Sequence, residues 1–185
     1  MALVAILDAS VLYPLPLRDT LLRIAETGCY DPCWSERILG EMTRNLIAKR
    51  GATDTQTEGL LDAMRQAFDT ATVPEQAIAR LEPAMTNNPK DRHVLATAAV
   101  ANAQVIVTLN LKHFPSSACE PLAVEPVHPD AFLLDLYSLD PDMALDAVAR
   151  QATALPRPPM TVDELLDRLA ATVPNFAQAL RTDRP

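Results

Sequence analysis

Two short, continuous apolar runs constrain the fold of this chain more than any other feature. Residues 3–7 read Leu-Val-Ala-Ile-Leu and lead directly into Asp8, and residues 104–109 form a second run that stops at Asn110. A strand that is apolar on both faces is typical of a parallel sheet covered by helices on both sides, because a strand with one wet face alternates between apolar and polar residues. The two runs therefore predict an α/β fold with a central parallel sheet.

Helical periodicity fills the sequence between the two runs. Ser35 is expected to cap the start of one helix and Gly51 to end it. Apolar residues recur at helical spacing in four segments: around 18–27, from 35 onward, 55–69 and 74–84.

A further helix is expected directly before the second apolar run. Its start is marked by Asn88 as the N-cap, Pro89 as the first helical residue and Asp91 as the third. A helix followed closely by a buried strand continues the alternation of an α/β sheet.

The pattern changes after Pro115, and the rest of the chain is expected to be helical. Residues 155–160, Leu-Pro-Arg-Pro-Pro-Met, form a stiff connector between the last two helices. We expect an α/β body over residues 1–128 and a helical extension over 129–185 packed on it. Three short helices are expected in that extension: around 131–137, after the cap Asp140-Pro141, and after the cap Thr161 with Glu164 three residues on.

Charge and glycine content exclude two kinds of nucleotide site. A formal net charge of −8 and a pI near 4.8 argue against sequence-independent binding of nucleic acid through a broad basic face. They leave room for a local basic rim, or for a phosphate reached through a bound cation. The four glycines form neither a G-x-G-x-x-G nor a Walker stretch, so no phosphate-binding loop is expected.

The cysteines and histidines do not predict a zinc site. Their spacing contains no C-x-x-C and no histidine pair suited to a metal, and reduced cysteines suit a cytoplasmic protein. The apolar start of the chain lacks a basic leader, and no apolar run approaches the ~20 residues of a membrane span, so a soluble protein is expected. These residues are Cys29, Cys33, Cys119, His93, His113 and His128.

Four polar residues at the ends and borders of these elements are candidates for chemistry. Asp8 and Asn110 each follow an apolar run, so both fall at the carboxyl edge of a parallel sheet, where open α/β sheets bind ligands. Asp91 stands at a helix start, and Glu41 falls just outside the apolar arc of its helix, where a carboxylate can face a cleft. Oxygen ligands of this kind suit Mg²⁺ or Mn²⁺.

Each candidate also has an ordinary structural explanation, and the sequence leaves both open. A carboxylate near a helix start complements the helix dipole, and an asparagine after a strand is common in turns. Asp8 could cap the next turn through Ser10 or backbone amides, and Glu41 could pair with Arg37 or Arg44 on its own helix.

Basic residues flank the four candidates. Arg44, Arg92 and Lys112 are the ones we expect to contact substrate phosphates, and a solvated helix face is the alternative. Trp34 and Tyr13 also lie near these segments and are interpreted as core or edge aromatics. The other basic residues nearby are Arg37, Lys49, Arg50 and Lys90.

Taken in order, four motifs resemble the PIN-domain family of metal-dependent ribonucleases, in particular the VapC-like toxins of bacterial toxin–antitoxin pairs. The resemblance covers most of residues 1–120 and includes, in one subgroup, a helical C-terminal extension. The motifs are "LDAS" around Asp8, "SERILGEMTRNL" around Glu41, "NPKDRHVLATAAVANAQVIVT" around Asp91 and "TLNLKHF" around Asn110.

The resemblance implies a set of roles. Asp8 and Asp91 would be the main ligands of Mg²⁺ or Mn²⁺, and Glu41 a further acid that binds the metal directly or through water. Asn110 falls where many relatives carry a fourth acid, and Lys90 where relatives often carry another. The reduced negative charge favours one firmly held metal ion.

The resemblance also implies an activity and partners. A metal-activated water would hydrolyse RNA and leave a 3′-hydroxyl and a 5′-phosphate. Single-stranded or loop RNA is the expected substrate, because an open cleft admits splayed nucleotides. A small antitoxin protein and a homodimer are the partners that the family implies.

Other classes of protein fit the residues less well. A haloacid-dehalogenase-type phosphatase needs a second aspartate two residues after the first, where this chain has Ser10. A phosphorelay receiver needs an acidic pair near the first strand, which is missing, although Lys112 could serve as its late lysine. The main alternative is a degenerate PIN domain that binds RNA or a protein without cutting, which Lys90 and Asn110 favour.

Overall fold

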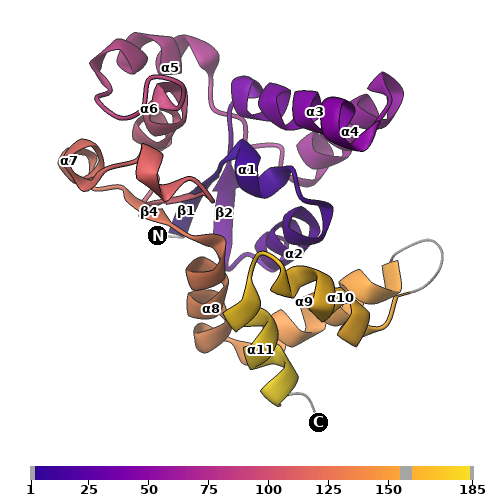
Figure 1. The fold of residues 1–185 in the computed structure, drawn as a ribbon. Helices are drawn as coiled ribbons and strands as arrows, with labels where there is room; N and C mark the ends of the chain where they lie inside the picture. The colour runs from indigo at the N-terminus through magenta and orange to yellow at the C-terminus, as the bar shows by residue number, and fades with distance from the viewer. Residues whose placement is uncertain (1–2, 155–159, 184–185) are drawn as a thin grey trace.

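A four-stranded parallel sheet forms the centre of the protein in the computed structural model, which describes residues 3–154 and 160–183 (Figure 1). The strand order is β2-β1-β3-β4, and every neighbouring pair is parallel. In the view of Figure 1, α5 and α6 lie above the sheet, and α2 and α8 lie below it. The predicted α/β fold with helices on both faces is confirmed. The strands are β1 (Leu3–Leu7), β2 (Tyr30–Cys33), β3 (Val105–Val107) and β4 (Glu125–Val127).

The two strands that the apolar runs predicted are the central ones. β1 has the expected bounds, while β3 is shorter than the run that predicted it. Ile6 and Ile106 stand opposite each other in the register, and both are fully buried. A strand with neighbours on both sides and helices on both faces has no wet position, which explains the continuous apolar pattern.

The two edge strands were not predicted, and each of them contains a proline. Pro32 lies in β2 opposite Ala5, and Pro126 lies in β4 opposite Ile106. Proline has no N–H to donate to the ladder, so it is tolerated in a sheet chiefly on edge strands. Beyond β2 the chain adds one more parallel bridge, between Trp34 and Thr72.

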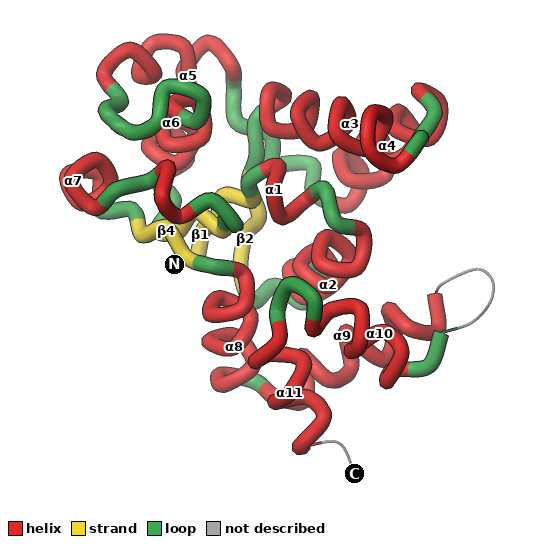
Figure 2. The backbone as a smooth tube through the Cα atoms, in the orientation of Figure 1, coloured by secondary structure: helices red, strands yellow, loops and turns green. Residues whose placement is uncertain are grey.

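Helices account for most of the remaining chain (Figure 2). The caps predicted for α3 are confirmed, because the Ser35 hydroxyl accepts a hydrogen bond from the Ile38 N–H and Gly51 ends the helix with a φ of 66°. The helices of the first two thirds are α1 (Ala9–Leu12), α2 (Leu15–Ala25), α3 (Glu36–Arg50), α4 (Asp54–Ala67), α5 (Glu75–Leu81), α6 (Arg92–Ala101) and α7 (Ser116–Cys119), with short 3₁₀ turns at Glu82–Ala84, Leu111–His113 and Glu120–Leu122.

The predicted start of α6 is wrong by a few residues. Asn88 does not cap a helix: its side chain accepts a hydrogen bond from the Lys90 N–H, and its carbonyl accepts one from the Asp91 N–H. This turn delays the helix until Arg92, so Asp91 occupies the N-cap position instead of the third helical position.

The C-terminal region holds four helices where three were expected. The predicted capping box of Thr161 and Glu164 is confirmed. The helix that it starts ends at Ala170, and a new helix begins at Pro174, because proline fits the first turn of a helix and not its interior. The predicted connector lies almost entirely in residues 155–159, outside the described residues. The four helices are α8 (Pro129–Leu139), α9 (Pro141–Ala154), α10 (Val162–Ala170) and α11 (Pro174–Asp183).

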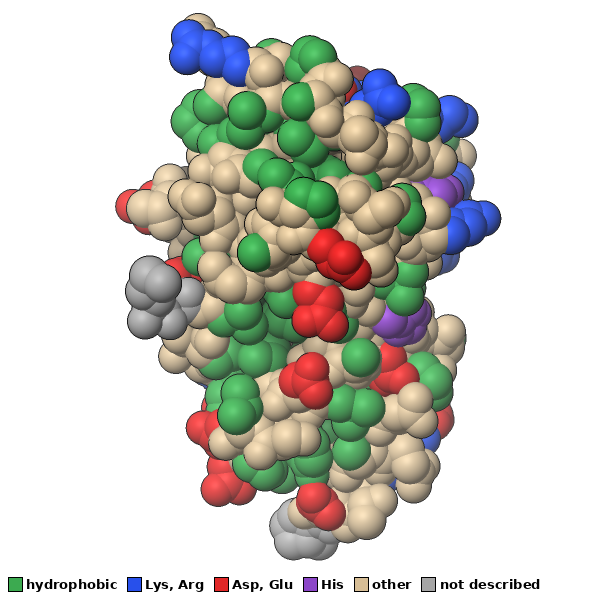
Figure 3. Space-filling model, turned by 90° about the vertical axis from the view of Figure 1, so that its left-hand side faces the viewer, with side chains coloured by type: hydrophobic (Ala, Val, Ile, Leu, Met, Phe, Trp, Pro, Cys, Tyr) green, Lys and Arg blue, Asp and Glu red, His purple; other side chains and the backbone are tan. Residues whose placement is uncertain are grey.

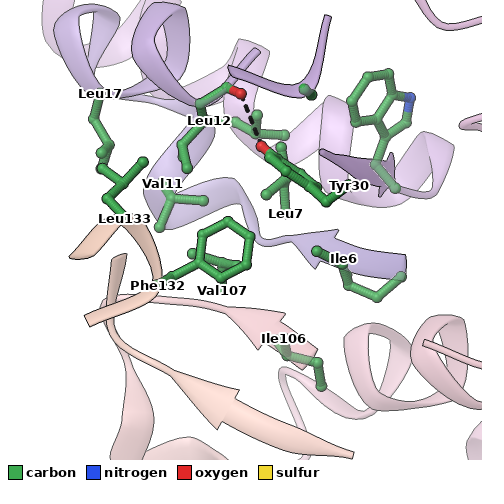
Figure 4. Close-up of a cluster of buried hydrophobic side chains, with 14 of the residues drawn as sticks. Ile6, Leu7, Val11, Leu12, Leu17, Tyr30, Ile106, Val107, Phe132 and Leu133 are labelled. Carbon is green, nitrogen blue, oxygen red and sulfur yellow. Dashed lines mark hydrogen bonds between the residues drawn. The ribbon is translucent and has the colours of Figure 1, made fainter. Parts of the chain in front are cut away.

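One hydrophobic core joins the sheet to the C-terminal helices. Phe132 and Leu133 of α8 lie beside Val11 and Tyr30 in Figure 4. The rings of Tyr30 and Phe132 meet edge to face with centroids 5.1 Å apart. Trp34 is fully buried, as its interpretation as a core aromatic predicted.

Buried polar contacts fix the C-terminal helices in place. The Thr20 hydroxyl of α2 donates to Gln151 Oε1 of α9 over 2.6 Å, and Gln151 Nε2 donates back to the Pro16 carbonyl over 2.9 Å. Both Thr20 and Gln151 are buried, so each loses water on folding and needs these partners. No described helix is both long and apolar enough to cross a lipid bilayer.

Candidate functional site

Asp8 lies where β1 passes into α1, at the carboxyl edge of the sheet. The apolar run ends at Leu7 and α1 begins at Ala9, so Asp8 alone connects the strand to the helix. Its N–H still donates to the Val107 carbonyl over 3.2 Å, which extends the ladder by one rung toward β3. Asp8 is only 3% exposed, and a buried carboxylate of this kind is costly unless it is hydrogen-bonded or neutralised.

Two hydroxyl groups bind the same oxygen of Asp8. Ser10 Oγ donates to Asp8 Oδ2 over 2.6 Å, and Thr108 Oγ1 donates to it over 2.7 Å. The hydroxyls are themselves fixed by the chain after β3, because Ser10 accepts from the Leu109 N–H and Thr108 from the Asn110 N–H. Asp8 is the N-cap residue of α1, but its side chain accepts no backbone N–H of that helix; of the structural alternatives, the contact with Ser10 is present and the one with backbone amides is not. Within the described residues Oδ1 receives no hydrogen bond, and it is free to bind a ligand.

Glu41 faces the helix that follows Asp91. Its Oε1 lies 3.1 Å from Nε2 of His93, and the ring is buried while the carboxylate side chain is 33% exposed. Arg37, offered as an alternative partner of Glu41, pairs with Glu82 instead. Glu41 is therefore directed toward α6, as its place at the border of the apolar arc predicted.

Asp91 has a histidine neighbour of its own. Its Oδ2 lies 2.9 Å from Nδ1 of His113, but the angles do not fit a directed hydrogen bond, and both atoms are buried without another partner. Burial raises the pKa of the Asp91 carboxyl above its ordinary value; His113 opposes the shift, and the negative charges of Asp8 and Glu41 add to it. The three carboxylates are thus close enough to interact.

The backbone of Asn110 is hydrogen-bonded to two residues that contact these carboxylates, Thr108 and His113. Its N–H donates to Thr108 Oγ1, and its carbonyl accepts from the His113 N–H over 2.8 Å. The structure gives its side chain no hydrogen bond in residues 3–154 and 160–183. The side-chain amide of Asn110 therefore has no hydrogen bond there, and both Asn110 and Thr108 lie just after the end of β3.

The chemistry of the donors fits a hard divalent cation. Asp91 is desolvated and near two other carboxylates, and His113 offsets only part of the resulting rise in its pKa. In the part of the chain that the structure describes, no group of three or more His, Cys, Asp or Glu side chains forms a ready-made cage that could hold a metal ion. Mg²⁺ does not need such a cage, since it keeps several waters and binds through one or two carboxylates plus substrate phosphates. Asp8 and Asp91, with Glu41, are the residues that could hold it.

The three basic residues expected at substrate phosphates differ in their surroundings. Arg44 and Lys112 are exposed, and neither makes an ion pair with another described residue. Arg92 is half-buried, with Nε buried and without a hydrogen-bond partner. These three side chains are therefore not neutralised by salt bridges with other described residues.

Sequence reasoning missed three residues of this site. Thr108 stands at the end of an apolar run, where a hydroxyl next to Asn110 was the available signal. His93 and His113 were considered only as zinc ligands and were set aside on spacing. His93 stands two residues after Asp91, and this proximity was the signal available for it, whereas His113 is far in sequence from the acid that it contacts.

The sequence matches two protein-family models. The model described as the PIN domain matches residues 4–112, and the one described as the VapC50 C-terminal domain matches residues 129–182. A protein of Mycobacterium tuberculosis (strain ATCC 25618 / H37Rv) named "Putative ribonuclease VapC50" is 46% identical over 98 residues, which are 53% of this chain and 58% of that protein. The match thus spans less than two thirds of the relative's length. No match was found among solved structures.

Proposed function

The chain belongs to the PIN-domain family, and on that premise we propose that it is a metal-dependent ribonuclease that hydrolyses RNA phosphodiester bonds. One observation carries the proposal. Three carboxylates from three separate segments, Asp8, Glu41 and Asp91, are close enough to interact; burial and the charges of the other two raise the pKa of Asp91, although His113 opposes the shift. A bound cation would relieve the repulsion between these carboxylates, and an enzyme acting on phosphates can use such a cation.

Each side chain of the site would have a separate role. Asp8 and Asp91 would hold Mg²⁺ or Mn²⁺, Glu41 would hold it directly or through water, and Asn110 would contribute its carbonyl. The bound ion supplies Lewis-acid chemistry: it makes water a better nucleophile and offsets negative charge on the phosphate. Ser10 and Thr108 keep Asp8 Oδ2 engaged, so Oδ1 is the oxygen that would bind the ion.

Single-stranded RNA is the substrate that fits the surroundings of the carboxylates. Arg44, Arg92 and Lys112 would contact its phosphates, because each lacks an internal acidic partner in the described chain. Attack by water, and not by the ribose 2′-hydroxyl, leaves a 5′-phosphate and a 3′-hydroxyl. Splayed bases of a loop or single strand can reach such an edge, while a duplex keeps its bases stacked inside.

The identity to the relative named as a ribonuclease supports a role as the toxin of a toxin–antitoxin pair. That relative's printed name supplies the activity, and the VapC50 C-terminal model covers the helical extension. A small antitoxin protein would then block the carboxylate cluster, and two copies of the chain could assemble as a homodimer. The division into a body over residues 1–128 and an extension over 129–185 belongs to the same proposal.

One observation favours a second function. Asn110 stands where a fourth acid would strengthen the metal site, and the two histidines lie against Glu41 and Asp91. A chain with too weak a hold on the metal would bind RNA or a protein partner without cutting it. This non-catalytic PIN domain is the alternative to the nuclease.

Cleavage of a mixed single-stranded RNA tests both. The assay compares Mn²⁺ and Mg²⁺ with EDTA, and the chain with Asp8→Ala, which deletes the carboxylate, and with Asp31→Ala, an exposed carboxylate on β2, as the matched control. We expect metal-dependent cutting with 5′-phosphate ends that Asp8→Ala abolishes and Asp31→Ala preserves. Binding of RNA without cleavage under both metals would support the non-catalytic function instead.

A further inference from the structure

One tyrosine ring gathers two positive charges at the far end of α3. Lys49 Nζ lies 5.5 Å from the centroid of the Tyr13 ring, and the guanidinium of Arg50 lies 5.6 Å from it. Arg50 Nε also donates to the Tyr13 hydroxyl over 3.0 Å. The negative face of an aromatic ring attracts cations, which offsets part of the repulsion between these two neighbours. We call Tyr13, Lys49 and Arg50 the cation–tyrosine cluster.

The cluster has no negative partner among the described residues. In residues 3–154 and 160–183, neither Lys49 nor Arg50 makes an ion pair, and both are exposed. Some other arginines are paired, as in Arg65 with Glu36 and Arg150 with Asp146, while Arg44 on the same helix as the cluster is also unpaired among the described residues. In a chain with 24 acidic and 16 basic residues, two adjacent unpaired cations mark a place where an outside anion is accepted.

The charge elsewhere on the surface contrasts with this cluster. The face in Figure 3 shows acidic side chains across its middle, between apolar areas, and its lysines and arginines lie at the margins. An RNA backbone would be repelled from such a face at low salt. Basic clusters without acidic neighbours are therefore the places that guide a polyanion over this molecule.

The chain connects the cluster to the carboxylates in two ways. Tyr13 follows directly on α1, the short helix that starts after Asp8. Lys49 and Arg50 lie on α3 eight and nine residues after Glu41, which is about 13 Å along the helix axis at 1.5 Å per residue. Arg44, exposed and unpaired among the described residues, stands between them on the same helix. A strand of RNA crossing the carboxylate edge meets the cluster within a few nucleotides.

We propose that Tyr13, Lys49 and Arg50 form an anion subsite for an RNA backbone phosphate away from the cleaved bond. The proposal rests on the ribonuclease function and deepens it, because it names where the substrate is held outside the carboxylates. Tyr13 acts by positioning: its ring and hydroxyl hold the two cations in one place before RNA arrives, so less side-chain freedom is lost on binding. The ion pair with phosphate then supplies the charge that the cluster lacks.

Binding of a fluorescent single-stranded RNA, followed by anisotropy in EDTA so that no metal-dependent cutting occurs, tests the subsite. The variant Lys49→Ala/Arg50→Ala is compared with Arg150→Ala/Arg168→Ala, which removes the same charge from α9 and α10. We expect about a tenfold loss of affinity at 0.1 M salt for the first variant only. The slope of log K against log salt should fall by about 0.7, because one phosphate contact of the single strand is lost.

Two tyrosine variants separate positioning from charge. Tyr13→Phe keeps the ring and should lose little affinity, while Tyr13→Leu removes the ring and should approach the double-alanine variant. Thermal melting of each variant checks that the fold is retained. Equal affinity and equal salt slope for both double variants would overturn the subsite.

The outcome stays distinct from that of the nuclease proposal. If the wild-type chain fails to cut RNA with either metal, and Lys49→Ala/Arg50→Ala still selectively weakens RNA binding, the subsite stands and the catalytic function fails. If the chain cuts RNA in an Asp8-dependent way and the double variant binds as the control does, the nuclease stands and the subsite is wrong.

Discussion

His93 Nε2 lies 3.1 Å from Glu41 Oε1 and joins the start of α6 to the middle of α3. The ring is fully buried, and its nitrogens have no directed hydrogen bond in the described structure. A buried imidazole needs a polar partner to replace the water that it loses on folding, and Glu41 is the close polar neighbour of His93. His93 is thus the side chain that sets where the Glu41 carboxylate sits relative to Asp91.

The first prediction follows from this contact. His93→Leu should leave Glu41 free to turn into solvent and weaken Mn²⁺ binding by about tenfold, the lower end for loss of a residue that orients a metal ligand. His93→Gln should recover part of that loss, because its amide can still donate toward Glu41. Calorimetric titration with Mn²⁺ measures both; equal affinity of the leucine and glutamine variants would contradict the role.

A second prediction concerns pH and Asp91. Its pKa lies above the ordinary 3.8, chiefly because burial disfavours the charged form, so the folded state keeps this proton to a higher pH than the unfolded state. The proton therefore stabilises the fold fully below pH 3.8, and that stability is lost as the pH rises through the folded pKa. The free energy of unfolding of the wild type, minus that of Asp91→Asn, should fall as the pH rises through this window.

Urea unfolding in EDTA at several pH values between 3.5 and 6.5 measures that difference. A difference that is flat, or that rises with pH, would show that the surroundings of Asp91 do not raise its pKa. Mn²⁺ added at pH 6.5 should raise the stability of the wild type by mass action and leave Asp91→Asn nearly unchanged.

The hydroxyl of Thr108 gives a third prediction. Thr108→Val keeps the shape of the side chain but leaves Asp8 Oδ2 with one hydrogen bond and the Asn110 N–H with none. Because Thr108 is fully buried, we expect a loss of about 1–3 kcal/mol in the free energy of unfolding. Thr153→Val, an exposed hydroxyl on α9, should change it by less than about 0.5 kcal/mol. Similar values for the two variants in urea titrations would refute the network.

A fourth prediction tests the attachment of α11 to α8. The Asp130 carboxylate of α8 accepts from the Phe176 N–H over 2.9 Å and from Asn175 Nδ2 over 2.7 Å, and so caps the start of α11. Asp130→Ala should lower the free energy of unfolding by about 1–3 kcal/mol, since buried donors lose a charged partner. Asp135→Ala on the exposed side of the same helix is the control, and thermal melting of both variants decides the matter.

Local patterns were enough to predict the parts of the fold that depend on few residues. The apolar run before Asp8 predicted β1, and Ser35 with Gly51 predicted both ends of α3. These signals are strong because a strand wet on neither face and a capped helix each follow from the chain nearby.

Other parts depend on partners that the sequence does not bring together. β2 and β4 contain Pro32 and Pro126, and a strand with proline is recognisable only when its place at the edge of the sheet is known. The contacts of His93 with Glu41 and of His113 with Asp91 join separate segments, so the sequence does not show which acid each histidine contacts. The start of α6 was wrong because the turn at Asn88 uses the same side chain that a helix cap would use.

The core that Tyr30 and Phe132 share has a consequence for how the chain reaches its fold. The two rings come from segments more than a hundred residues apart, and α8 covers the lower side of the sheet in Figure 1. A ribosome that adds about 5–20 residues per second makes β1 and β2 roughly 5–20 seconds before α8 emerges. During that time α2 is on that side of the sheet but α8 is not, so the apolar surface that α8 covers stays exposed until the last third of the chain is being synthesised.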